Sequence, residues 1–109
     1  MNYKCKQLYV GGNVDLWLAS WEGLKAGDEA PAWDKIGTFA TVEVTGDADG
    51  VEILGSISGK DFFLLNDSDT LPLTFSSSGI KSCNDTFQSI KPKKIGPGVA
   101  NVSMLIRRN

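Results

Sequence analysis

The stretch Thr38-Phe-Ala-Thr-Val-Glu-Val-Thr45, with Gly46-Asp-Ala-Asp-Gly50 and Val51-Glu-Ile-Leu-Gly-Ser-Ile57 after it, shows the pattern that decides the fold. Val42 and Val44 alternate with polar neighbours, as in a strand with one face on a core and the other in water. The glycine-flanked segment between the two apolar runs is typical of a tight hairpin connection. These features predict two antiparallel strands joined by a short turn.

Turn residues separate further short apolar runs toward the C-terminus. Leu71–Phe75 is expected to be a short peripheral strand, because Pro72 cannot donate a hydrogen bond to a neighbouring strand. Val102, Met104 and Ile106 lie at every second position in the closing strand. About eight strands at this spacing predict an all-β fold, a single antiparallel β-sandwich that is jelly-roll-like.

The N-terminal third is expected to be less regular than the rest. Residues 1–36 would form an arm and a loop region ahead of core strands at residues 37–109, all within one domain. Asp15–Trp21 fits either a strand or a helix, because both spacings gather its apolar side chains. Gly23–Trp33 has the breaks of a loop. Residues 1–12 could form an arm that docks onto a partner, since chain termini stay loose unless they are tied down.

Composition narrows the classes of partner. Hydrophobic residues make up 41 % of the 109 residues, which is enough for one modest core. No apolar run approaches the roughly 18 to 20 residues that span a bilayer, and none follows the first lysines as it would in a secretory signal. An isoelectric point near 4.9 argues against nucleic acid as the main partner. We therefore expect neither a membrane nor a nucleic acid among the partners.

Recognisable catalytic groups are missing from the sequence. It contains no histidine, the commonest general base and a favoured metal ligand. Cys5 and Cys83 are far apart in the chain and are expected to be free thiols. Gly46–Gly50 superficially resembles a calcium loop, but the later oxygen ligands of such loops are absent. We therefore expect a protein that is not an enzyme and that has no cofactor and no metal site.

Aromatic and basic side chains are the candidates for binding. The three tryptophans could stack on sugars or anchor a subunit interface, or they could be ordinary core residues. Among them Trp33, inside the expected loop, is the strongest interface candidate. Lys91-Pro-Lys-Lys94 is a compact basic segment beside a turn, suited to an acidic surface or simply solvated. The full set of candidate contact residues is Tyr3, Leu8, Tyr9, Trp17, Trp21, Trp33, Lys91, Lys93, Lys94, Arg107 and Arg108.

The order of short motifs along the chain resembles a family of small tailed-phage virion proteins. The matching motifs, in order, are Trp21-Glu-Gly-Leu24, Gly27-Asp28 with Ala30-Pro31, Gly37-Thr-Phe39, Ile53-Leu-Gly-Ser56, Leu65-Asn-Asp67, Leu73-Thr-Phe75, Gly79-Ile80, Ile90-Lys-Pro92 and Leu105-Ile-Arg-Arg108. The set is similar to the decoration, cement or staple proteins of podophage-type capsids. This chain departs from the family pattern at Leu54, where the family has an acidic residue, and at Ser58-Gly59, where a turn is shorter.

The resemblance implies a noncatalytic virion protein on the outer capsid surface that reinforces contacts between capsomers. Its partner would be the major capsid protein, and it would act as a small homo-oligomer, a dimer or a trimer. It would be made in the host cytoplasm and end up on the virion. The alternatives are a carbohydrate-binding or host-recognition module of a head or tail fibre, which would use exposed aromatic rings, and a head–tail or tail structural component.

Overall fold

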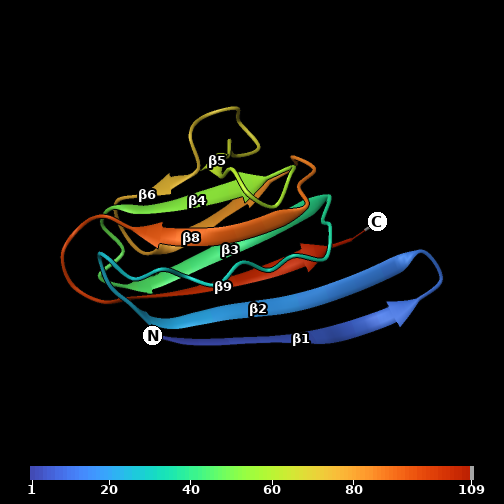
Figure 1. Ribbon diagram of the computed structural model, residues 1–109, viewed down its shortest axis with the longest axis horizontal. Coiled ribbons are helices and arrows are strands. Elements are labelled where there is room, and N and C mark those ends of the chain that lie inside the picture. The colour runs from blue at the N-terminus through green and yellow to red at the C-terminus, as the bar shows by residue number, and fades with distance from the viewer. Residues whose placement is uncertain (109) are drawn as a thin grey trace.

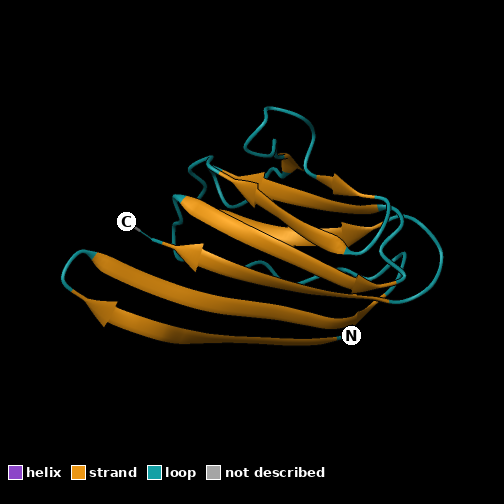
Figure 2. Cartoon of the chain, turned by 180° about the vertical axis from the view of Figure 1, so that it is seen from behind, coloured by secondary structure: helices purple, strands orange, loops and turns teal. Residues whose placement is uncertain are grey.

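Nine antiparallel strands form two sheets that pack face to face as a β-sandwich (Figures 1 and 2). A computed structural model describes residues 1–108 of the chain, and none of these residues is helical. The expected all-β sandwich is confirmed, with one strand more than the sequence suggested. Among the described residues no helix is long and apolar enough to cross a membrane.

The larger sheet has five strands, and the last strand of the chain lies in its middle. In spatial order the strands are β1 (Asn2–Gly11), β2 (Val14–Leu24), β9 (Ala100–Arg107), β3 (Phe39–Gly46) and β7 (Gly79–Cys83). Met104 on β9 lies between Ala19 and Val42 on its two neighbours. All three side chains are fully buried, as the period-2 pattern of the closing strand requires.

The smaller sheet is built around one strand. β4 (Val51–Ser56) pairs with β5 (Phe63–Leu64), β6 (Thr74–Phe75) and β8 (Ser89–Lys94). The expectation of a short strand near Pro72 is confirmed, because β6 has only two residues. Pro92 lies within β8, where pairing with β4 on one side leaves the missing N–H on the outer edge.

Three aromatic side chains fill the space between the sheets. Trp21, Trp33 and Phe87 are the largest fully buried side chains, and Trp33 meets Phe87 edge-on with ring centroids 6.3 Å apart. The indole N–H of Trp21 donates a 2.8 Å hydrogen bond to the carbonyl of Pro31. This bond holds the segment after β2 against the larger sheet, so that Trp33 can pair with Ile90 as an isolated bridge.

The N-terminal region is more regular than expected. β1 and β2 are the two longest strands, and residues 2–11 pair with β2 instead of forming a loose arm. The ambiguous segment Asp15–Trp21 is a strand. This strand pairs with β1 along one edge and with β9 along the other. Pairing with β9, which is distant in the sequence, explains why the segment is extended although its apolar spacing also fits a helix.

The backbone of the turn between β3 and β4 packs directly against the backbone that follows β8. Gly50 has a φ of 75°, and a Cβ atom there would overlap the backbone of Gly96. The N–H of Ile95 donates a 2.7 Å hydrogen bond to the carbonyl of Gly50, and Lys94 Nζ donates one of 2.7 Å to the carbonyl of Asp49. These two hydrogen bonds hold the turn before β4 against the end of β8. The two backbones approach so closely that both Gly50 and Gly96 have to be glycine.

We predict that Gly50→Ala costs more stability than Gly12→Ala. Both glycines have a positive φ, but nothing lies within 4 Å of a Cβ added at Gly12. Backbone strain alone should lower the free energy of unfolding by about 1–2 kcal/mol at Gly12. Overlap with Gly96 should add about 1–3 kcal/mol at Gly50. Urea unfolding measures both losses, and equal losses would show that the two backbones are not close-packed.

Candidate functional site

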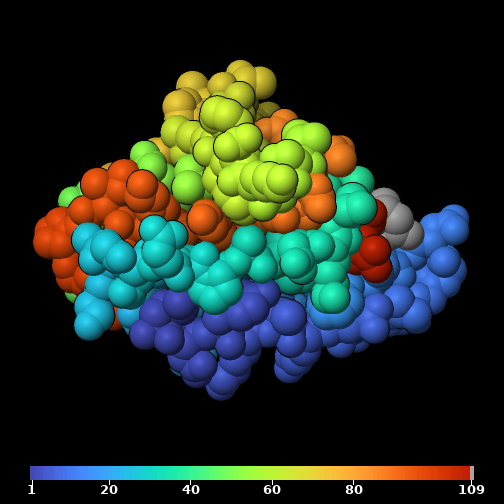
Figure 3. Space-filling view, viewed as in Figure 1, coloured from blue at the N-terminus to red at the C-terminus, as the bar shows by residue number. Residues whose placement is uncertain are grey.

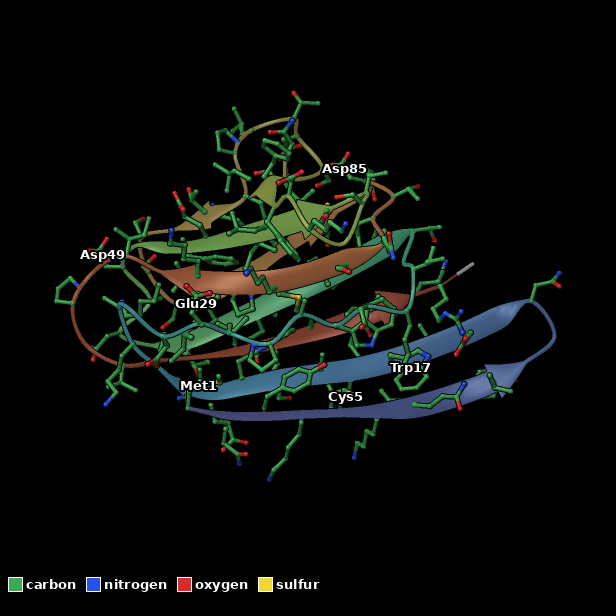
Figure 4. All side chains as sticks on the ribbon, viewed as in Figure 1. Met1, Cys5, Trp17, Glu29, Asp49 and Asp85 are labelled. Atoms are coloured by element: carbon green, nitrogen blue, oxygen red, sulfur yellow. The ribbon has the colours of Figure 1, made fainter. Side chains whose placement is uncertain are left out.

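The hairpin of β1 and β2 projects past the rest of the sandwich. Its turn lies at one end of the long axis, where no strand of the smaller sheet accompanies it (Figures 1 and 3). The molecule is 42 Å long along this axis against 27 and 26 Å across it. We call the residues nearest the turn, Leu8–Leu16, the hairpin tip. The turn around Asp49 lies at the opposite end of the molecule (Figure 4).

The local sequence explains both the turn and its twist. Gly11 pairs with Val14, and Gly12 takes the positive φ of 57° that the two-residue connection needs. The register shifts between Gln7 and Tyr9, so Leu8 is an extra residue in β1. A bulge of this kind increases the local twist and makes the outer edge of a strand a poorer template for pairing.

Apolar side chains gather on the hairpin tip in contact with solvent. Leu8, Tyr9, Val10 and Val14 have exposed fractions between 37 and 63 %. Four exposed apolar residues within one short hairpin differ from the isolated apolar residues that any surface carries. The tip is therefore suited to burial against another molecule.

Asp15 fastens the hairpin tip to the body of the protein. Its carboxylate accepts hydrogen bonds of 2.9 Å from Gln7 Nε2 and from Arg108 Nη1. Arg108 also donates from Nε to the carbonyl of Lys35 at 2.6 Å, so one guanidinium joins the C-terminus, the hairpin and the segment before β3. The hydrogen bond from Gln7 and the nearby charge of Arg108 hold the pKa of Asp15 below its usual range.

Tyr3 belongs to the base of the hairpin and not to the tip. Its ring stacks at a tilt on Trp21, with centroids 5.1 Å apart. Burial, together with a hydrogen bond to Cys5, raises the pKa of the phenol. Tyr3 therefore helps to hold β1 on the larger sheet, whereas Leu8 and Tyr9 from the same candidate set are presented to solvent.

The tryptophans point into the sandwich. Trp21 and Trp33 are fully buried, so the core alternative holds for both and neither presents its ring at the surface of this chain. Trp17, which is labelled in Figure 4, is half-buried. Its ring contacts Trp33, and the ammonium group of Lys35 lies 5.1 Å from its ring centroid. Trp33 is buried although it lies outside the strands, because its backbone pairs with the distant residue Ile90.

The basic segment Lys91–Lys94 does not form the compact patch that the sequence suggests. It is part of β8, and so successive side chains point to opposite faces. Lys94 is buried with its amine on the carbonyl of Asp49, and the Lys91 amine lies 4.3 Å from the ring centroid of Phe62. Only Lys93 is exposed. At the C-terminus Arg107 is exposed, whereas Arg108 is engaged with Asp15.

Sequence reasoning missed two residues of the tip and one further apolar hollow. Val10 and Val14 flank the Gly11-Gly12-Asn13 turn. Apolar residues on both sides of a glycine-rich turn are the sequence feature that could have indicated an exposed apolar hairpin tip. Beside β4 and β5, a hollow of about 310 Å³ is lined by the apolar side chains of Ile57, Phe63, Leu65 and Phe87, with polar residues at its margin. No group of three metal-ligating side chains occurs among the described residues. Cys5 and Cys83 are both free thiols.

Searches against protein-family models, curated proteins and solved structures return no match for this chain. The function has to be argued from the geometry and chemistry of the hairpin tip itself.

We predict that the hairpin tip loosens in acid because of Asp15. A carboxyl whose folded pKa lies below its unfolded value of about 3.8 stabilises the fold above that value. This contribution disappears as the pH falls through the folded pKa. Amide protection of the tip, measured by hydrogen exchange with NMR detection, should therefore decrease in that acid range.

Asp15→Asn is the matched control for this titration. It should lower protection of the tip already at neutral pH, because an amide cannot form the ion pair with Arg108, and it should remove the acid-dependent change there. An unaltered acid response in Asp15→Asn would assign the loosening to another carboxyl group.

Proposed function

We propose that this chain is a noncatalytic structural protein of a tailed-phage virion that binds the outer capsid surface and reinforces contacts between capsomers. The observation that carries the proposal is the projecting hairpin tip with its exposed side chains Leu8, Tyr9, Val10 and Val14. The order of motifs along the chain, which resembles decoration proteins of podophage-type capsids, supports the same role. The partner is the major capsid protein.

A fastened hairpin is a suitable device for such a contact. Binding costs free energy for every segment that must be ordered, and the tip is already ordered by strand pairing and by the bonds between Asp15, Gln7 and Arg108. Burial of its apolar side chains contributes roughly 25 cal/mol for each Å² removed from water. Tyr9 adds a phenol that can hydrogen-bond at the rim of the contact.

Reinforcement follows from preferential binding. A protein that binds the assembled lattice more tightly than free capsid subunits stabilises the lattice by mass action. The sandwich supplies a rigid body behind the tip, with one cluster of buried apolar side chains packed between the two sheets. No proton transfer is needed for this task, which is consistent with a chain that has no histidine.

The carbohydrate-binding alternative has weaker support from the geometry. A sugar platform needs aromatic rings that lie open to solvent, and Trp21 and Trp33 face the core. Among the described aromatic residues, Phe63 on β5 and Tyr9 at the tip are the exposed ones, and they lie on different sheets. A place on the tail instead of the head would use the same tip on a different partner.

Binding to undecorated phage heads tests the proposal. We predict that the parent protein binds at a fixed, saturable copy number and raises the temperature at which the heads open. Val10→Asp should weaken this binding at least about tenfold, because it places a charge in an apolar contact. Leu71→Asp is the matched control, since Leu71 is also exposed and lies in the loop between β5 and β6.

Two results would contradict the proposal. One is equal binding of Val10→Asp and the parent, with both proteins folded by circular dichroism. The other is a parent protein that binds host glycans but not heads, which would favour the host-recognition alternative.

A further inference from the structure

No other part of residues 1–108 covers the outer face of the larger sheet, whose side chains are exposed or partly exposed. Ala19 and Met104 point into the core, so the residues next to them, such as Leu18 and Leu105, point the opposite way. Leu105 keeps an exposed fraction of 46 %. Small polar side chains adjoin these two leucines. This face carries both apolar and polar side chains and is open to contact with a second molecule.

Two shallow hollows lie side by side on this face and share Leu18. One hollow, of about 430 Å³, is lined by residues of β1 and β2, among them Lys4 and Lys6. The other, of about 380 Å³, is lined by residues of β2, β9, β3 and β7, among them Glu43 and Leu105. The surface is therefore hollowed on both sides of the line between β2 and β9.

The charges on this face follow a definite order across the strands. In one row, the backbone pairing aligns Lys4, Ser20, Ser103 and Glu43 on β1, β2, β9 and β3. In the next row it aligns Lys6, Leu18, Leu105 and Thr41 on the same strands. In the first row a positive group thus lies on β1, a negative group lies on β3, and two serines lie between them. Ile80 on β7 extends this row by one residue beyond Glu43.

We infer that two copies of this chain pack face to face through this surface, about a two-fold axis that runs along the strands between β2 and β9. Such an axis exchanges β2 with β9 and β1 with β3. It places Lys4 of each copy opposite Glu43 of the other, and Leu18 opposite Leu105. Ser20 meets Ser103, and these small side chains allow the sheets to approach to the roughly 10 Å of aligned sheet packing.

Charge complementarity selects a second copy as the occupant. The first row is its own complement under the two-fold axis, because it runs from Lys4 to Glu43 in one copy and from Glu43 to Lys4 in the other. A uniformly acidic partner would match Lys4 and Lys6 but would be repelled by Glu43. A uniformly basic partner would meet the reverse problem.

The dimer would present two hairpin tips on the same side. A two-fold axis parallel to the strands leaves their direction unchanged, so both β1–β2 turns project from the same end of the pair. Two tips on one body can bind a repetitive lattice at two points, which raises the apparent affinity through effective concentration. This consequence rests on the proposed function, whereas the dimer itself does not.

Sedimentation velocity over a concentration series tests the dimer with charge-reversal variants. Lys4→Glu alone and Glu43→Lys alone should each weaken self-association at least about tenfold, because each places like charges opposite one another twice per dimer. The two changes combined in one chain should restore self-association. An equimolar mixture of the two single variants should also associate, since each introduced charge then meets its opposite.

Lys93→Glu is the matched control, because Lys93 is exposed on β8 of the other sheet and should leave association unchanged. A parent protein that stays monomeric up to about 100 μM overturns the inference. The inference is also overturned if Lys4→Glu does not weaken dimerisation and the equimolar mixture of the two single variants associates no better than either variant alone. Val10→Asp should leave the dimer intact, because Val10 lies at the hairpin tip and not in the dimer contact. If the parent protein dimerises but does not bind phage heads, the result contradicts the proposed function and leaves the dimer standing.

Discussion

The pairing of β9 with β2 on one side and β3 on the other holds this structure together. The strand comes last in the chain but lies in the middle of the larger sheet, so the sheet is complete only when the C-terminus is in place. Its alternation also sets both faces. Val102, Met104 and Ile106 close the core, while Ser103 and Leu105 face outward. Pairing between strands so distant in sequence is typical of folds that form slowly.

The unequal sizes of the two sheets explain where the binding surfaces lie. β5 and β6 have two residues each, whereas β1 and β2 are the longest strands, so the larger sheet extends past its partner. Apolar residues on the overhanging hairpin have no second layer to cover them. The exposed tip is thus a consequence of the architecture, and Asp15 with Arg108 keeps this overhang in one position.

Local sequence predicts the strands well and the surfaces poorly. Period-2 alternation located β3, β4 and β9, and Pro72 marked a short strand, because these signals depend on neighbouring residues. The burial of Trp33 and of Lys94 depends on Ile90 and Asp49, which are far away in the chain. For the same reason Leu8 and Tyr9 were recognised as contact candidates, but their grouping with Val10 and Val14 became visible only once the overhang was known.

Hydrogen–deuterium exchange of the protein alone and bound to phage heads tests the central claim most directly, that the hairpin tip is the surface that meets a partner. We expect slower exchange on binding in residues 8–16, with β4 and β8 in the smaller sheet unchanged. Protection confined to the hollow beside β4 and β5, with no change at the hairpin tip, would contradict it.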